Sequence, residues 1–169
     1  RDEAALLLGV APFGMIYAIA ALAAGVPAWV AQLASALVFA GAAQLVIVQM
    51  LAAGAGALPI ALTAGLLNVR HVLYSASMAD YVRHLPRRWR LLLAYLLTDE
   101  AYAVAVLRYQ RREDGPTAVQ ADAPRSSGEI EPEGGPDLRH WYFLGAGFTL
   151  WAGWQASTAV GLLFAATIP

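Results

Sequence analysis

The sequence has no cysteine and no lysine, and these absences exclude several kinds of site. Without cysteine, the chain has no disulfide, no thiolate metal site and no cysteine nucleophile. Without lysine, it has no Gly-rich phosphate-binding loop of the usual type. It also lacks His-Glu-x-x-His and Gly-x-Ser-x-Gly motifs, and His71 alone cannot form a zinc site. We therefore expect no enzyme activity, no metal site and no cofactor.

Charge is scarce as well. Only 14% of the residues are charged and 59% are hydrophobic, whereas soluble proteins average about 25% charged residues. No charged side chain occurs from Ala4 to Val69. The net charge of −1 and the absence of a basic stripe exclude a nucleic-acid partner. The composition instead predicts that the lipid bilayer surrounds most of the chain.

Five apolar stretches are close to or longer than the about 20 residues that a helix needs to cross a bilayer. They are residues 4–24, 28–53, 58–78, 91–107 and 141–169. We therefore expect an all-α, polytopic transmembrane fold with some segments kinked or broken. Pro12, Gly14 and Gly41 are the expected kinks, because proline lacks a backbone N–H. At Pro12 either an unwound, ligand-binding helix or a plain packing kink fits the sequence.

In terms of domains, residues 1–107 contain the first four membrane segments and residues 141–169 contain the fifth. Residues 108–140 are rich in proline, glycine, serine and acid, so we expect a polar, disordered connector outside the bilayer. The chain begins at Arg1 rather than methionine, and both ends are expected to be trimmed.

The arginines give conflicting signals about orientation. The polar stretch from Arg83 to Arg90 is predicted to be cytoplasmic by the positive-inside rule. However, Arg108, Arg111 and Arg112 follow the next segment, which places them on the opposite side if that segment crosses once. We prefer the first loop as the cytoplasmic one.

Polar residues occur within two of the apolar segments. Asn68, Arg70, His71 and Tyr74 lie in the third, and Thr98, Asp99 and Glu100 lie in the fourth. A charged side chain at a helix centre costs about 2.5 to 3.5 kcal/mol on insertion scales. Arg70 and Asp99 are about equally far from the loop that joins these segments, so antiparallel packing brings them to one depth. We expect them to pair.

On helical spacing, these residues form polar strips that face each other. One strip is Asn68, His71 and Ser75, and another is Tyr95, Asp99 and Tyr102. The strips are typical of a substrate or ion pathway, in which Glu100, Asp99 or His71 carries protons. The alternative is an ion pair that only holds helices together.

Two further features predict roles in packing or binding. Gln44, in the second segment, either binds substrate or forms a hydrogen bond between helices. Small residues recur every four positions in the last segment, which predicts a ridge where another helix approaches closely. They are Gly145, Thr149, Gly153, Ser157 and Gly161. Trp151 and Trp154 lie too deep for an interfacial belt and are expected to fill space or line a cavity.

Four stretches together resemble the AzlC family, the large subunit of the branched-chain amino acid exporter. They are Ala11-Pro12-Phe13-Gly14, Phe39-Ala40-Gly41-Ala42-Ala43-Gln44, Asn68-Val69-Arg70-His71-Val72-Leu73-Tyr74 and Leu97-Thr98-Asp99-Glu100. The resemblance implies a multi-pass carrier of the bacterial inner membrane that exports valine, leucine, isoleucine or related amino acids. It also implies a small hydrophobic membrane subunit, AzlD-like, as partner.

The residues themselves favour a zwitterionic substrate, because one cation and one anion beside an apolar pocket suit a small apolar amino acid. In this hypothesis Arg70 and Asn68 hold the carboxylate, and Asp99 or Glu100 holds the amino group or a proton. Backbone groups at Pro12 and Gly41 join them. We expect an exporter driven by proton motive force. The alternatives are a scaffold or accessory subunit that transports nothing, and a channel.

Overall fold

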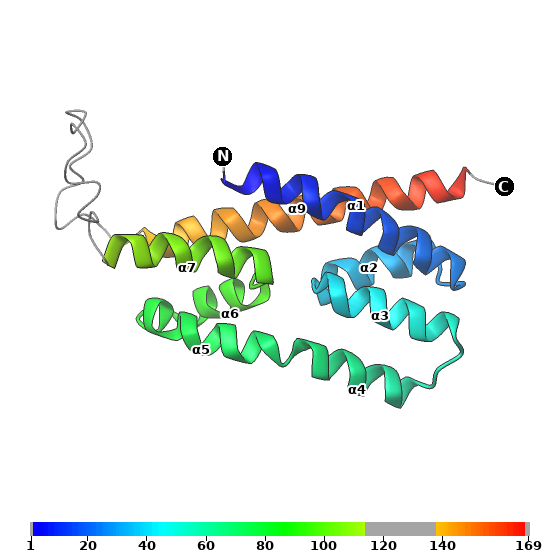
Figure 1. Cartoon of the computed structure of the whole chain (residues 1–169), viewed down its shortest axis with the longest axis horizontal. Helices are drawn as coiled ribbons and strands as arrows, with labels where there is room; N and C mark the ends of the chain where they lie inside the picture. Colours follow the sequence, from blue (N-terminus) through cyan, green and yellow to red (C-terminus); the bar gives the residue numbers. More distant parts are fainter. Residues whose placement is uncertain (1, 114–137, 168–169) are drawn as a thin grey trace.

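The structure, a computed structural model, describes residues 2–113 and 138–167. These residues form helices joined by short turns and contain no strand, which confirms the predicted all-α fold (Figure 1). The helices are α1 (Asp2–Ala23), α2 (Ala28–Val38), α3 (Gly41–Ala52), α4 (Ala57–Asn68), α5 (Arg70–Val82), α6 (Arg87–Tyr95), α7 (Asp99–Glu113) and α9 (Arg139–Ala166).

The two helices at the ends of the chain, α1 and α9, pack side by side along much of their length (Figure 1). With 22 and 28 residues they measure about 33 and 42 Å, enough for a bilayer core of about 30 Å. Helix α1 continues through Pro12, so the unwound helix considered there is wrong. A kink at Pro12 and Gly14 stays a prediction.

The second predicted segment is broken in the middle and folds back on itself. Helices α2 and α3 have 11 and 12 residues, or about 16 and 18 Å, so neither crosses a bilayer core alone. Figure 1 shows the chain reversing between them, at Phe39 and Ala40, directly before the predicted kink at Gly41. The Gln44 side chain on one arm donates a hydrogen bond to the Ala34 carbonyl on the other, at 3.0 Å.

The fourth predicted segment is a second hairpin, formed by α6 and α7, with its break at residues 96–98. Tyr81 at the end of α5 and Tyr109 near the end of α7 have ring centroids 4.9 Å apart. The chain therefore returns to the end from which α6 began, and the assumption of a single crossing is wrong. The break also places Tyr95 and Asp99 on different helices, so the predicted strip through them is not one helix face.

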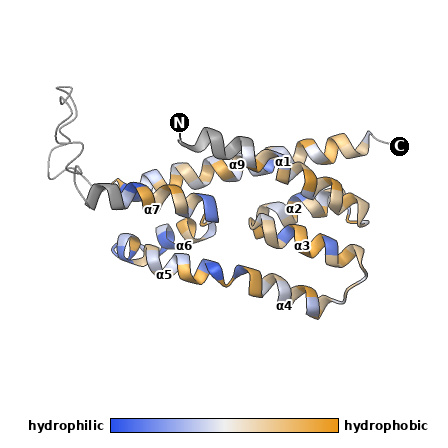
Figure 2. Ribbon diagram, in the orientation of Figure 1, coloured by the Kyte–Doolittle hydropathy of each residue, from blue (hydrophilic) through white to orange (hydrophobic). Residues whose placement is uncertain are grey.

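Helices α4 and α5 follow each other in one long stretch, residues 57–82, interrupted at Val69. Among the described residues, this is the one helical stretch both long and apolar enough to cross a membrane by itself. Helix α4 has no buried residue, and Leu66 is 75% exposed. Figure 2 shows mostly apolar residues along the α4 ribbon and hydrophilic residues at the start of α5 and α7. This long helix therefore presents an exposed apolar surface in the described structure.

The predicted polar connector lies mostly outside the described residues. At its two ends the prediction was wrong, because α7 continues to Glu113 and α9 begins at Arg139. An arginine on each helix contacts a tyrosine ring there: Arg108 lies 4.7 Å from the centroid of Tyr142, and Arg139 lies 5.5 Å from that of Tyr81. Helices α7 and α9 therefore extend beyond the apolar segments 91–107 and 141–169 that hydropathy alone predicted, and these contacts join their ends.

Candidate substrate site at the helix breaks

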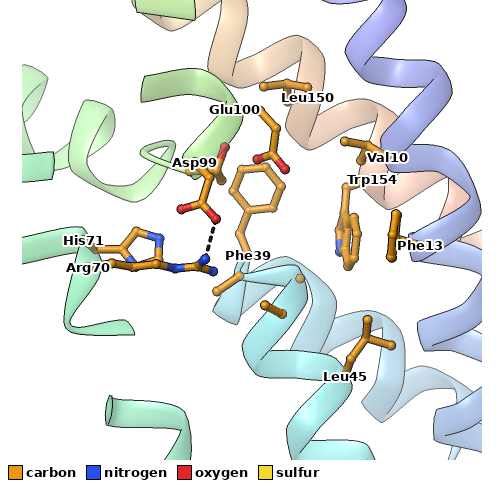
Figure 3. A pocket seen from close by; sticks show the side chains of 14 residues that line it. Val10, Phe13, Phe39, Leu45, Arg70, His71, Asp99, Glu100, Leu150 and Trp154 are labelled. Atoms are coloured by element: carbon orange, nitrogen blue, oxygen red, sulfur yellow. Dashed lines mark ion pairs between the residues drawn. The ribbon is translucent and has the colours of Figure 1, made fainter. Parts of the chain in front are cut away.

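A cavity of about 260 Å³ lies where the two hairpin tips and the α4–α5 break meet. Its walls come from five parts of the chain: α1, the α2/α3 tip, the start of α5, the start of α7 and the middle of α9. The lining residues are Val10, Phe13, Phe39, Ala40, Gly41, Ala42, Leu45, Arg70, His71, Thr98, Asp99, Glu100, Leu150 and Trp154 (Figure 3). Charged groups gather on one side of it and apolar and aromatic groups on the other.

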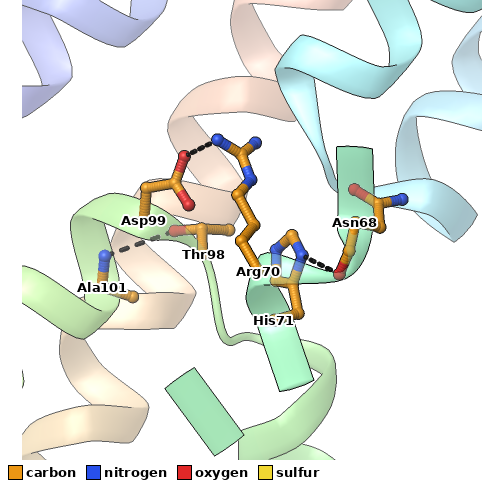
Figure 4. Close-up of polar contacts among 6 residues, drawn as sticks. All are labelled: Asn68, Arg70, His71, Thr98, Asp99 and Ala101. Atoms are coloured by element: carbon orange, nitrogen blue, oxygen red, sulfur yellow. Dashed lines mark hydrogen bonds and ion pairs between the residues drawn. The ribbon is translucent and has the colours of Figure 1, made fainter. Parts of the chain in front are cut away.

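Arg70 and Asp99 form the ion pair that the sequence predicts. The Arg70 guanidinium lies 2.5 Å from the Asp99 carboxylate, and the side chains are 34% and 39% exposed (Figure 4). Arg70 is the first residue of α5, and Asp99 is the first residue of α7. Among the residues that the structure describes, the second Asp99 oxygen, Oδ1, and the Arg70 Nε have no hydrogen-bond partner. The pair is therefore formed but not saturated.

The start of α7 holds both acidic residues of the site. The Thr98 hydroxyl accepts a hydrogen bond from the Ala101 backbone N–H at 3.3 Å and so caps the helix (Figure 4). Carboxylates in a first helical turn are stabilised by the helix dipole. Within the described part of the chain, Glu100 forms no ion pair. Glu100 is thus the free negative charge of the cavity.

Three of the predicted site residues do not line the cavity: Asn68, Tyr74 and Gln44. Asn68 accepts a hydrogen bond from the His71 ring through its backbone carbonyl, at 3.2 Å (Figure 4). Tyr74 stacks on Tyr102 with centroids 4.5 Å apart, which ties α5 to α7. Gln44 is buried within the hairpin, where its amide N–H bonds the Ala34 carbonyl. These side chains support the walls, whereas Arg70, His71, Thr98, Asp99 and Glu100 form them.

Two carbonyls in the last turns of α2 accept hydrogen bonds from side chains of other helices. Gln44 bonds the Ala34 carbonyl, and the Tyr95 hydroxyl donates to the Ala36 carbonyl. The Trp151 indole N–H in turn donates to the Tyr95 hydroxyl at 2.7 Å. Backbone that breaks inside a membrane is tolerated where such partners satisfy it or where it lines a cavity. This network therefore fixes the position of the α2/α3 tip against α6 and α9.

The α2/α3 hairpin is also tied to α9 by two buried or half-buried polar pairs. The Ser35 and Thr158 hydroxyls lie 3.1 Å apart, and the Gln32 amide donates to the Gln155 side chain at 2.7 Å. These contacts could not be predicted from the sequence, because isolated polar residues in an apolar run do not reveal their partners.

The apolar part of the cavity was likewise only partly anticipated. Trp154 was expected to fill space or line a cavity, but Phe39, Leu45 and Leu150 carry no signal that separates them from other apolar residues. Phe39 has φ 25° and ψ 49°, a backbone conformation that bulky side chains rarely adopt. A helix break at such a residue could not be read from composition.

The predicted ridge of small residues on α9 packs along part of its length. A Cβ atom at Gly161 would lie 2.8 Å from the Met15 Cα and the Ala18 Cβ of α1. Ser157 lies against Gly14, where a Cβ would overlap its hydroxyl. Gly145, in contrast, is exposed and has no neighbour there within 4 Å. Gly147, outside the predicted ridge, approaches Leu96 at the second hairpin tip instead.

Comparison with known families decides which kind of membrane protein this is. The AzlC protein family matches residues 5–168, nearly the whole chain. The chain belongs to the AzlC family. This family is linked to transport, and the three helix breaks of this AzlC protein coincide with three of the motifs that carry the resemblance.

Relatives of this AzlC protein are bacterial membrane proteins. It is 27% identical over 165 residues to the inner membrane protein YgaZ of Escherichia coli. The matched region covers 95% of the chain and 57% of the relative. It is 34% identical over 100 residues to an uncharacterized membrane protein of Helicobacter pylori, covering 59% of the chain and 43% of the relative. The chain thus spans about half the length of these relatives. No solved structure matches it. The protein is a multi-pass protein of the bacterial inner membrane.

Proposed function

We propose that this protein exports branched-chain or related small apolar amino acids, coupled to proton motive force and together with a small hydrophobic membrane subunit. The observation that carries the proposal is the cavity at the three helix breaks. It combines an apolar wall with a cation, Arg70, and two carboxylates, Asp99 and Glu100. An apolar amino acid needs the same combination, because its side chain avoids water while its two charged groups require partners.

The size of the cavity supports a small substrate. Pockets for drug-sized ligands measure about 300 to 1,000 Å³, and this cavity is smaller at about 260 Å³. Phe13, Phe39 and Leu45 supply the apolar contacts for an aliphatic side chain. The free carboxylate of Glu100 accepts the ammonium group or a proton, whereas Arg70 and Asp99 already neutralise each other. Asn68 is left out of the binding role proposed from the sequence, because it does not line the cavity.

Broken helices are the usual construction of transporter sites. In many carriers the substrate binds near the middle of the bilayer between discontinuous helices, whose ends provide backbone donors and acceptors. Here two hairpins enter from opposite ends and their tips meet beside the break between α4 and α5 (Figure 1). The unpartnered apolar face of α4 supports a partner subunit on that side. Leu58, Leu62 and Leu66 are each at least 65% exposed on it.

Efflux from vesicles tests this function. The full-length protein, with and without its small subunit, is reconstituted and loaded with labelled valine, leucine, isoleucine or methionine under an imposed pH gradient. A proton-coupled exporter gives saturable efflux that the gradient accelerates and that requires both subunits. A channel gives flux that does not saturate. Efflux no faster than from empty vesicles, for all four amino acids, contradicts transport and favours a scaffold held by the Arg70–Asp99 pair.

A further inference from the structure

The α2/α3 break leaves backbone donors at the start of α3 without partners. On the α2 side, Gln44 and Tyr95 bond the Ala34 and Ala36 carbonyls. On the α3 side, no side chain caps the helix, and the first N–H with a helical partner is that of Gln44, which bonds the Ala40 carbonyl at 2.9 Å. The three N–H groups before it, at residues 41–43, have no carbonyl partner in the described structure.

These donors open into the cavity. Ala40, Gly41 and Ala42 all line it, and α3 has no acidic residue in its first turn to neutralise the helix dipole. The N-terminus of a helix carries about half a positive charge and binds anions through its free N–H groups. Helix α7, whose start also faces the cavity, differs because Thr98 caps it and two acids occupy its first turn.

Trp154 provides an independent indication that an acceptor belongs at this place. The residue is 5% exposed, yet its indole N–H has no hydrogen-bond partner in the described part of the chain. A buried donor without a partner costs about 1 to 3 kcal/mol, so tryptophan usually finds one. Figure 3 shows the indole nitrogen on the cavity side of the ring. Gly41 lets the six-membered edge of the ring approach the α3 N-terminus, because a Cβ there would lie 2.8 Å from the Trp154 Cη2 atom.

We infer that the substrate carboxylate binds at the N-terminus of α3, where the Trp154 indole N–H and the first backbone N–H groups of α3 donate to it. This inference rests on the proposed function and replaces Arg70 as the carboxylate partner, since Arg70 is already paired with Asp99. Glu100 then receives the ammonium group from the other side of the cavity. Trp154 is therefore a substrate-binding residue and not only a filler of space.

The test removes the donor but keeps most of the ring. Trp154→Phe is compared with the unmodified full chain in lipid nanodiscs, using competition against labelled L-leucine. L-leucine and L-leucinamide are the competitors, because the amide keeps the ammonium group and side chain but has no carboxylate. Loss of one hydrogen bond to a charged group predicts about 10- to 100-fold weaker binding of leucine. Leucinamide affinity should not change. Trp29→Phe, at an exposed position on α2, is the matched control.

Equal weakening of leucine and leucinamide by Trp154→Phe, or no weakening of leucine, overturns the inference. Should the variant fail to fold, the unmodified chain labelled with ¹⁵N in its five indole rings answers the same question. The Trp154 N–H resonance, assigned by exclusion from the other four tryptophans, should shift with leucine and not with leucinamide. A resonance that moves equally with both ligands, or with neither, overturns the inference.

A third ligand separates failure of the inference from failure of the proposed function. The carboxylate 4-methylpentanoate has leucine's side chain and carboxylate but no ammonium group, and it is used in labelled form so that its binding is measured directly. If it binds and is weakened by Trp154→Phe while leucine does not bind, the α3 carboxylate site stands and the amino acid substrate is wrong. If leucine binds but Trp154→Phe does not discriminate, the function stands and the carboxylate site is wrong. If neither binds, both are wrong.

Discussion

At the scale of single residues, the charged side chains of the site differ in whether another charge already neutralises them. Arg70 and Asp99 form an ion pair with each other, whereas Glu100 has no ionic partner among the residues described. A carboxylate without a partner in a membrane cavity is a group that gains and loses a proton or a cationic ligand during function. In the proposed exporter, the two adjacent acids at the start of α7 have different tasks: Asp99 positions the arginine, and Glu100 binds the ammonium group or a proton.

Replacement of Glu100 tests its role in coupling. In Glu100→Gln the side chain keeps its shape and hydrogen-bonding capacity but no longer takes up or releases a proton. We expect efflux of labelled leucine to become independent of the imposed pH gradient. Asp80→Asn is the control, because Asp80 is an exposed acid at the end of α5, where it pairs with Arg83 at 3.4 Å. Acceleration by the gradient that survives in Glu100→Gln would exclude Glu100 as the proton carrier.

The Arg70–Asp99 pair can be tested by exchanging its two residues. Arg70→Asp and Asp99→Arg alone each juxtapose like charges. Because both side chains are about one-third exposed, we expect each to lose about 1 to 3 kcal/mol, between the values for exposed and buried pairs. Thermal unfolding in detergent should show partial recovery in the double variant, since opposite charges again face each other.

The double variant also distinguishes an ion pair that takes part in transport from one that only holds the helices together. In a carrier, the exchange places a positive charge beside Glu100 at the start of α7 and a negative charge on the opposite wall, so transport should stay lost although stability returns. Recovery of transport together with stability would show that the pair only holds the helices together.

At the scale of helices and hairpins, the sequence predicted where the chain is apolar better than how it turns. The depth match of Arg70 and Asp99 followed from counting residues away from a loop, because helices of known rise keep such registers. The reversals at Phe39 and at residues 96–98 could not be predicted from the sequence, because neither contains a proline or a pair of glycines. Their breaks depend on contacts between distant residues, such as Tyr95 with Ala36 and Gln44 with Ala34.

Glycine substitutions on α9 test the packing between helices. Two of the positions are expected to change the free energy of unfolding in opposite directions. Gly161→Ala places a methyl group 2.8 Å from backbone and side-chain atoms of α1, so we expect a loss of about 1 to 3 kcal/mol from overpacking. Gly145→Ala meets nothing within 4 Å and should gain about 0.5 to 1 kcal/mol from helix propensity. Thermal unfolding of both variants in the same detergent measures the difference. Equal shifts in the two variants would contradict the α1–α9 interface.

At the scale of the whole molecule, the two hairpins change how the chain is threaded through the bilayer. A chain of five simple crossings places its two groups of arginines on opposite sides. The structure places them at one end, because Tyr81 beside the first group contacts Tyr109 beside the second. The positive-inside rule is then consistent, since both groups can be cytoplasmic. The disagreement in the sequence arose from treating residues 91–107 as one crossing.

Single cysteines test this threading, and the natural absence of cysteine makes each label unambiguous. His84→Cys in the turn after α5 and Arg108→Cys near the end of α7 should react with a membrane-impermeant maleimide from the same side of a sealed vesicle. Ala55→Cys, between α3 and α4, should react from the other side, because the long α4–α5 stretch separates it from His84. Labelling of positions 84 and 108 from opposite sides would show that the α6–α7 region crosses the bilayer. The cavity would then lose the hairpin tip that carries Asp99 and Glu100.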